Sequence, residues 1–210
     1  MLYKDPFIIS PKTFQLIQEL QSMACLIDFY LVGGTALALQ LGHRNSIDID
    51  LFTQKDFDDT ALIEDISNEY NFKEIFRRKN TIISLVDNIK TDFIRHGYPF
   101  IKPPKIEEGI RFLGLEDIAA MKLHAIVQSG KRLKDFIDIY FLLQHLTMAE
   151  IIGYYETKYT FSNAVIALKA LNYFDDIDEE MDPPKMIVPI SIIEIKTRIK
   201  ASILNPNITF

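Results

Sequence analysis

The sequence contains a single cysteine, Cys25. One thiol cannot form an internal disulfide, so the chain is not a disulfide-held scaffold, and this cysteine content suits a reducing cytoplasm. The neighbours of Cys25 are apolar, which favours a buried structural thiol over a nucleophile. Stability must therefore come from a hydrophobic core. With 48% hydrophobic residues among 210, the chain can build such a core in one large domain or two small ones.

The sequence also lacks an excess of basic residues and any long apolar run. Its formal net charge is −6, so no general basic surface indicates nucleic acid, although a local patch such as the basic run 77–79 stays open. No uncharged apolar run reaches the roughly 18 to 20 residues that a membrane helix needs. The first ten residues, "MLYKDPFIIS", lack the apolar core of a signal peptide. We therefore expect a cytoplasmic protein with no membrane partner.

The apolar pattern changes near Gly114. Before it, strand-like alternation and helical spacing take turns, whereas after it only helical spacing is found. This pattern predicts an α+β chain with a first domain over residues 1–114 and a helical domain over residues 115–210. The expected helices are 11–24, 35–42, 56–70, 115–130, 132–146, 148–158, 162–173 and 191–204. The expected strands are 28–32, 46–52, 72–78, 81–86, 90–96 and 109–114.

Two adjacent glycines, Gly33 and Gly34, separate a predicted strand from a predicted helix. Glycine lets the backbone approach a ligand closely because no Cβ intervenes. The helix expected to start near Thr35 points free N–H groups and its positive dipole end at the same place. Such a corner suits a phosphate group. Arg44 and Ser46, a few residues further on, could reach that phosphate or cap the turn.

Two carboxylates, Asp48 and Asp50, follow on the next predicted strand. Residues two apart on a strand project from the same face, so their oxygens can converge on one or two Mg²⁺ ions. Asp92, on the predicted strand 90–96, is the best candidate for a third ligand. A phosphate corner beside paired carboxylates is what phosphoryl or nucleotidyl transfer requires. Each feature alone also has a plain structural explanation, as an ordinary turn or as the wet face of a strand.

The helical half contributes a lysine and two further acids. Lys122 lies among apolar neighbours, where a lysine either extends to solvent or binds a triphosphate. Asp135 and Asp138 are three residues apart on a helix and share a face. Like charges that close are unfavourable, which indicates a cation between them. The basic residues considered for that role are Lys131, Arg132 and Lys134.

These residues carry a resemblance to a known superfamily. Gly33-Gly34 followed by Asp48-x-Asp50 resembles the signature of the nucleotidyltransferase superfamily related to polymerase beta. The longer stretch "LVGGTALALQLGHRNSIDIDLF" resembles its AbiEii/AbiGii-type toxin branch. The stretch "GLEDIAAMKLHAIVQSGKRLKDFIDIYFLL" resembles the motifs of that branch's helical half.

The resemblance implies a mixed-sheet nucleotidyltransferase core followed by a helical domain. It implies Asp48 and Asp50 as Mg²⁺ ligands, with the triphosphate of a bound NTP at Gly33, Gly34 and Thr35. Lys122 would match the lysine of the branch, and Asp135 or Asp138 its acidic partner. An RNA end such as tRNA is the implied acceptor, and a type IV antitoxin the implied partner.

Two classes of function follow. The first is an Mg²⁺-dependent enzyme that moves a nucleoside monophosphate from an NTP to an acceptor hydroxyl on RNA, protein or a small molecule. The second is a non-catalytic nucleotide- or partner-binding relative of the same fold. The carboxylate set discriminates between them, because a binding module does not need three converging acids.

Overall fold

The computed structural model describes residues 1–180 and 183–210. The chain forms two compact units. The first comprises Met1–Pro99 and Pro104–Leu113, and the second comprises Phe100–Pro103 and Gly114–Phe210. A short excursion of the chain at Phe100–Pro103 therefore belongs to the second unit although it lies between two strands of the first.

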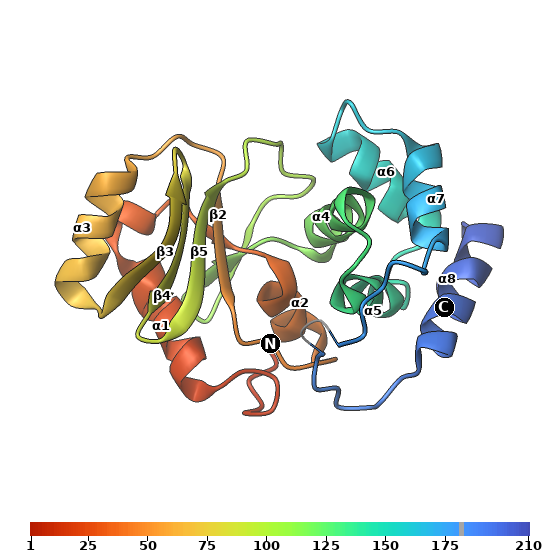
Figure 1. Ribbon diagram of the computed structural model, residues 1–210, viewed down its shortest axis with the longest axis horizontal. Helices are drawn as coiled ribbons and strands as arrows, with labels where there is room; N and C mark the ends of the chain where they lie inside the picture. Colours follow the sequence, from red (N-terminus) through yellow and green to blue (C-terminus); the bar gives the residue numbers. More distant parts are fainter. Residues whose placement is uncertain (181–182) are drawn as a thin grey trace. The chain divides into compact units, whose positions relative to one another are not determined.

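One mixed sheet organises the first unit (Figure 1). Among the described residues it has seven strands in the order β3-β4-β5-β2-β1-β7-β6. β2 runs parallel to β5 and β1 to β7, whereas the other neighbours are antiparallel. The predicted α+β class with a mixed sheet is confirmed. The strands are β1 (Tyr30–Leu31), β2 (Ile49–Thr53), β3 (Phe72–Arg78), β4 (Thr81–Val86), β5 (Ile89–Arg95), β6 (Lys105–Glu107) and β7 (Ile110–Phe112).

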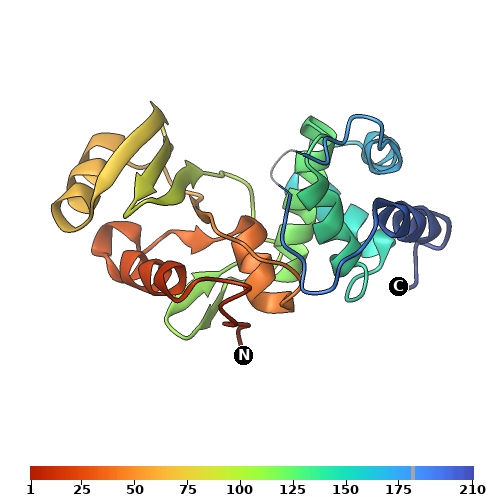
Figure 2. The ribbon, with the colours of Figure 1, turned by 60° about the horizontal axis from the view of Figure 1, so that its bottom comes forward.

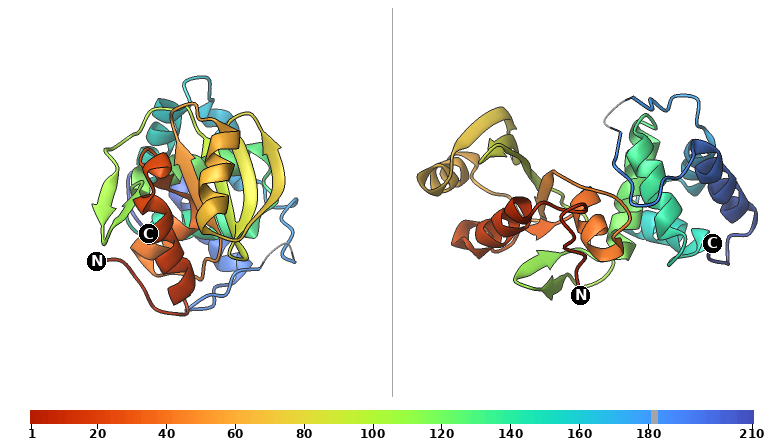
Figure 3. Two further views of the ribbon diagram at one scale, coloured as in Figure 1. Left: turned by 90° about the vertical axis from the view of Figure 1, so that its left-hand side faces the viewer. Right: turned by 90° about the horizontal axis from the view of Figure 1, so that it is seen from below.

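The helices of this unit are α1 (Pro11–Ser22), the 3-10 turn η1 (Ala24–Leu26), α2 (Gly33–Leu41) and α3 (Asp59–Glu69). α1 and α3 lie on the same side of the sheet, in front of the strands when the unit is viewed from that side (Figure 3, left). α1 also lies beside β7 (Figure 2), where the Gln21 side chain donates to the carbonyl of Arg111 and accepts from its N–H, at 2.9 and 2.6 Å. Ser10 is the N-cap of α1, and its hydroxyl accepts from the Thr13 N–H.

The central strands separate a buried face from a polar one. Leu51, Ile82 and Phe93 are each 0% exposed and form the core side. Because successive residues of a strand point to opposite faces, Asp50 and Asp92 project from the other side. Within β2 the alternation thus places Ile49 and Leu51 in the core and Asp50 on the open face, whereas Ile47, ahead of the strand, is 60% exposed.

Three local expectations need correction. α2 begins at Gly33, so the glycine pair forms its first turn rather than a separate loop before Thr35. β6, which pairs with β7, had no signal in the sequence, because three residues are too few for a recognisable alternation. Cys25 is half-buried rather than buried. Burial, with Asp65 and Glu69 nearby, raises the pKa of its thiol to about 11, so it stays protonated and is a poor nucleophile.

The second unit is helical. α4 packs against α5, α6 and α7, and α8 packs against α5 and α7. Its core includes Ile118, Leu123, Phe136, Ile139 and Ile151, each 0% exposed. None of the helices in residues 1–180 and 183–210 has the length and apolarity to cross a membrane. The helices are α4 (Leu115–Gln128), α5 (Leu133–Leu142), α6 (Met148–Lys158), α7 (Ala164–Asn172) and α8 (Ile192–Leu204).

Candidate active site

The first turn of α2 is built from the two glycines for steric reasons. Gly33 has φ +69°, and a Cβ there would overlap the carboxylate of Asp50. A Cβ on Gly34 would overlap the guanidinium of Arg44, which is 2% exposed. Val32 is the N-cap residue of α2, and its side chain makes no hydrogen bond to the first turn of the helix. The helix start, with its positive dipole end, thus lies between a carboxylate and a guanidinium.

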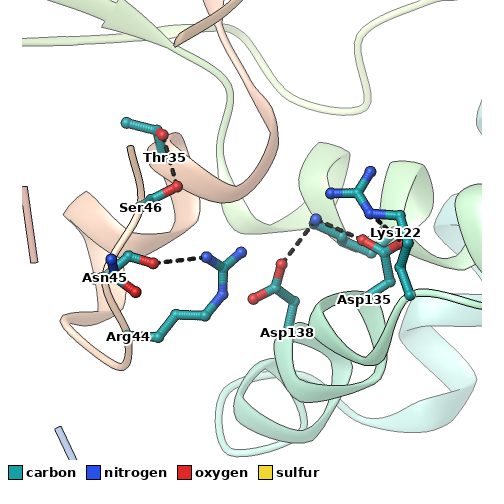
Figure 4. Close-up of polar contacts among 8 residues, drawn as sticks. Thr35, Arg44, Asn45, Ser46, Lys122, Asp135 and Asp138 are labelled. Atoms are coloured by element: carbon teal, nitrogen blue, oxygen red, sulfur yellow. Dashed lines mark hydrogen bonds and ion pairs between the residues drawn. The ribbon is translucent and has the colours of Figure 1, made fainter. Parts of the chain in front are cut away.

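Thr35 fastens this helix start to the strand that carries the acids. Its hydroxyl lies 2.8 Å from the hydroxyl of Ser46 (Figure 4). The same hydroxyl donates to the backbone carbonyl of Asp48. Thr35 is 1% exposed. Arg44 donates to the carbonyl of Asn45 at 2.9 Å. Thr35 and Ser46 therefore connect the start of α2 to the segment before β2. The backbone N–H groups near Gly34 and the guanidinium of Arg44 are the groups suited to bind an anion.

Two of the three predicted carboxylates are paired on one face of the sheet, and the third precedes the strand. Asp50 and Asp92 are register partners on the neighbouring parallel strands β2 and β5. Asp48 stands two residues before Asp50, immediately ahead of β2. Asp92 is 8% exposed. The strand position proposed for Asp92 from the sequence thus puts it beside Asp50.

Lys90 is a cation within this acidic cluster that the sequence analysis missed. Its Nζ lies 3.1 Å from Asp92 Oδ2. Burial lowers its pKa, but Asp92, with Asp48 and Asp50, outweighs that effect and leaves the pKa above the ordinary 10.5. Burial raises the pKa of Asp92 above 3.8, Lys90 opposes this, and Asp48 adds to it. The signal was available, because residues 90 and 92 share a strand face.

The donors in this cluster fit a hard divalent cation. Asp92 Oδ1 is buried and has no hydrogen-bond partner, which is costly unless a cation or a proton compensates it. The described residues nevertheless contain no group of three or more His, Cys, Asp or Glu side chains already arranged to hold a metal ion. The carboxylates are thus chemically suitable ligands for a divalent cation, but their side chains are not arranged around a common metal position.

The helical unit holds the second cluster that the sequence predicts. Lys122 of α4 lies 2.8 Å from Asp135 Oδ1 and 2.8 Å from Asp138 Oδ2, both on α5 (Figure 4). The Lys122 side chain is 8% exposed and that of Asp138 is 0% exposed. The predicted cation between the two acids is therefore Lys122, not a residue of the run 131–134. Of that run, Arg132 lies 3.9 Å from Asp135 Oδ2.

A second buried ion pair lies nearby in the same unit. Lys158 Nζ is 2.8 Å from Asp117 Oδ1, and both side chains are 0% exposed. Asp117 also accepts from the backbone N–H groups of Ile101 and Lys102, at 3.0 to 3.1 Å. This pair fixes the excursion Phe100–Pro103 to α4 and α6. Sequence reasoning missed both residues, since an aspartate in a first helical turn and a lysine in a last turn are ordinary.

Comparison with known proteins places the chain in a family. Residues 18–189 match the family model described as "Nucleotidyl transferase AbiEii toxin, Type IV TA system". An uncharacterized protein of Aquifex aeolicus (strain VF5) is 36% identical over 173 residues, which is 80% of this chain and 84% of that protein.

Solved structures give more distant similarities. JHP933 from Helicobacter pylori is 16% identical, with 76% of this chain and 86% of that chain covered at a TM-score of 0.48. The Megavirus polyadenylate synthase is 18% identical, with 65% and 32% covered at a TM-score of 0.43. The family assignment rests on the match of residues 18–189, which contains both clusters described above. The chain belongs to the AbiEii nucleotidyltransferase toxin family, and it is a nucleotidyltransferase.

Proposed function

We propose that this protein is an Mg²⁺-dependent nucleotidyltransferase that moves a nucleoside monophosphate from an NTP to a hydroxyl at an RNA end such as tRNA. In this proposal it acts as the toxin of a type IV toxin–antitoxin pair and has a cognate antitoxin as its partner. The observation that supports the chemistry most directly is the register pair Asp50–Asp92 beside the Gly33 turn. The description of the matched family supports the toxin role.

The proposal assigns metal binding and phosphate binding to different residues. Asp48, Asp50 and Asp92 would hold one or two Mg²⁺ ions, because hard cations select carboxylate oxygens. Bound Mg²⁺ would neutralise the triphosphate and stabilise charge on the leaving pyrophosphate. The α2 N-terminus at Gly33 and Gly34, with Thr35, Arg44 and Ser46 behind it, would position the phosphates.

In the transfer itself, the acceptor oxygen forms a bond to the α-phosphorus while the bond to pyrophosphate breaks. The acceptor hydroxyl loses its proton as this bond forms. Asp92, paired with Asp50 on the neighbouring strand, is the carboxylate that we propose for uptake of that proton. Lys122, Asp135 and Asp138 are included in this proposal because of the family resemblance, and the two carboxylates fix the position of the lysine.

The proposal is tested by incubating the protein with each labelled NTP, Mg²⁺ and total RNA, followed by identification of the labelled product. Asp48→Asn, Asp50→Asn and Asp92→Asn should each abolish transfer without unfolding the protein, because an amide keeps the volume and removes the charge that Mg²⁺ requires. Full activity in the Asp48 or Asp50 variant would refute the proposal.

Asp87→Asn is the matched control. Asp87 lies in the β4–β5 turn at φ 51°, and its Oδ1 accepts from the Asn71 N–H at 3.1 Å. Asparagine tolerates this conformation and keeps that acceptor. We therefore expect Asp87→Asn to transfer like the wild type. A dead Asp87 variant beside an active Asp92 variant would show that Asp92 is not the third ligand.

A further inference from the structure

The register of the sheet extends the carboxylate face across two more strands. Asp92 is paired with Ile83 of β4, and Ile83 is paired with Phe76 of β3. Directly paired residues share a face of the sheet. A row of side chains therefore runs from Asp50 through Asp92 and Ile83 to Phe76, the last of which is 48% exposed.

Two parallel rows flank this one. On one side Ile94 is paired with Phe52 of β2 and with Thr81, which is in turn paired with Arg78. On the other side Lys90 is paired with Leu85, and Leu85 with Lys73. The carboxylates of this face therefore lie on β2 and β5, with Lys90 beside Asp92, whereas the face of β3 carries two cations and an aromatic ring.

A β-bulge decides which residues of β3 join this face. The register shifts between Glu74 and Phe76, which leaves Ile75 as the extra residue. A bulge changes the side to which the following residues point. Phe76 and Arg78 consequently lie on the carboxylate face, whereas Arg77 shares the opposite face with Glu74.

The charges on β3 differ between its two faces. Arg77 Nε lies 3.5 Å from the carboxylate of Glu74, so its charge is partly neutralised. Lys73 and Arg78 are exposed, and within residues 1–180 and 183–210 neither forms an ion pair. Arg78 donates only to the hydroxyl of Thr81, at 3.4 Å. The uncompensated positive charge of this strand therefore lies on the carboxylate face.

Aromatic rings border the same face at the ends of β2 and β5. The Phe52 ring centroid lies 5.7 Å from that of His96, and His96 lies 4.8 Å from Tyr98, which is 41% exposed. The backbone N–H of His96 donates to Thr53 at 2.7 Å, so the segment is tied to β2. Nucleobases stack on exposed aromatic rings with little regard to sequence.

We propose that this face binds the single-stranded 3′ end of an RNA acceptor, with its backbone at Lys73 and Arg78, its bases at Phe76 and Phe52, and its terminal hydroxyl at Asp92. The inference rests on the proposed function and names its acceptor surface. Charge complementarity supports RNA as the ligand. Lys73 and Arg78 lie on β3, three strand spacings or about 14 Å from β2, so the RNA phosphates can contact these cations without approaching the carboxylates. An overall net charge of −6 confines such binding to this local patch.

The test measures binding of a labelled single-stranded oligoribonucleotide to the full chain by fluorescence anisotropy, without NTP and with Mg²⁺ present. Arg78→Gln and Arg77→Gln form a matched pair, because they remove the same charge from neighbouring positions on opposite faces. We expect Arg78→Gln and Lys73→Gln to weaken binding about five- to tenfold and to lower the salt slope by about one unit each. Arg77→Gln should stay within about twofold of the wild type.

The aromatic contribution has its own control pair. Phe76→Ala should weaken RNA binding about tenfold through lost stacking, whereas Ile75→Ala, in the bulge, should not. Circular dichroism and NTP binding of each variant establish that the fold and nucleotide site are intact. The proposed RNA-binding surface would be wrong if Arg77→Gln and Arg78→Gln lowered RNA affinity equally, or if the wild type bound no RNA. The RNA proposal would also be wrong if polyglutamate displaced the RNA equally well from the wild type and from Phe76→Ala. That result would favour a protein acceptor.

The surface and the proposed function fail in different ways. If the wild type binds NTP and transfers nucleotide while the Arg78 and Phe76 variants behave like it, only the surface is wrong. If the wild type neither binds nor transfers NTP, the proposed function is wrong whatever the RNA measurement shows.

Discussion

At the scale of single residues, Lys122 is the clearest case in which a contact changes an expectation. From the sequence alone, alanine at this helical position should cost NTP binding more than stability. The structure places Lys122 between two carboxylates that are 5% and 0% exposed. Removing one partner of a buried ion pair leaves uncompensated charge, which typically costs about 3–5 kcal/mol.

We therefore predict that Lys122→Ala lowers the free energy of unfolding by about 3–5 kcal/mol, measured by urea denaturation. Lys169→Ala, at an exposed position of α7, should change it by less than about 0.5 kcal/mol. Replacing Lys122, Asp135 and Asp138 together by Met, Asn and Asn should restore much of the loss, because no charge is left buried. A Lys122→Ala variant as stable as the wild type would show that the pair contributes nothing.

Gly33 permits a second residue-scale prediction with an internal control. Gly33 and Gly109 both have positive φ, +69° and +78°, but a Cβ on Gly109 meets nothing closer than Gln18 Nε2 at 3.9 Å. Alanine at Gly109 should cost only the backbone penalty of about 1 kcal/mol. Alanine at Gly33 pays that penalty and also displaces the Asp50 carboxylate. We expect Gly33→Ala alone to lose nucleotide transfer, measured as label incorporated from NTP; equal transfer by the two variants would contradict this role for Gly33.

At the scale of elements, the hydrogen bonds that connect α2 to the segment before β2 determine where Asp48 and Asp50 lie. Thr35 is buried, and its hydroxyl meets both the Asp48 carbonyl and Ser46. Thr35→Val keeps the shape but leaves a carbonyl without its donor, at a cost of about 1–3 kcal/mol. The strand start should then move relative to the helix, so we predict a higher KM for NTP as well as a lower stability.

Thr157→Val is the control for this change. The Thr157 hydroxyl also donates to a carbonyl, that of Gly153 at 2.7 Å, but on an exposed part of α6 where water can replace it. Its loss should leave both stability and KM within experimental error. If Thr35→Val and Thr157→Val behave alike in steady-state kinetics, Thr35 does not position the site.

Elements with strong local signals were predictable from the sequence. α6 occupies Met148–Lys158 as expected, and a capping box of Thr147 and Glu150 begins it. β4 and β5 follow their alternation and are joined by a turn at Asp87 and Asn88, both with positive φ. The sequence placed Asp92 on a strand, but its pairing with Asp50 depends on the strand order of the sheet, which local periodicity does not give.

What could not be predicted depends on contacts between distant parts of the chain. Asp117 lies forty-one residues before Lys158, so no local pattern relates these two partners. The pairing of Lys122 with Asp135 or Asp138 was implied only by the family resemblance. The bulge at Ile75 is equally hidden, because "FKEIFRR" reads as a regular strand. These features follow from packing of whole elements, which periodicity does not specify.

At the scale of the whole molecule, the acidic cluster should make stability depend on both pH and Mg²⁺. Burial raises the pKa of Asp92 above 3.8, so the native state binds a proton at a higher pH than the unfolded chain does. The stability of the metal-free protein should consequently fall as pH rises through the window from 3.8 to that raised pKa. Lys90, whose pKa lies above 10.5, contributes stability below that value and loses it only at higher pH.

Mg²⁺ should compensate the same charge. A ligand that binds only the native state stabilises it by about 2.7 kcal/mol at a concentration 100 times its Kd. Because Mg²⁺ requires the ionised carboxylate, we predict a clear rise in Tm with Mg²⁺ at neutral pH that shrinks as the buffer becomes acidic. Asp92→Asn should show a smaller Mg²⁺ effect with little pH dependence, and Asp87→Asn should follow the wild type. Thermal unfolding of the three proteins with and without Mg²⁺ measures this directly. An Mg²⁺ effect of equal size at acidic and neutral pH, or one fully retained in Asp92→Asn, would show that the cation binds elsewhere on this acidic chain.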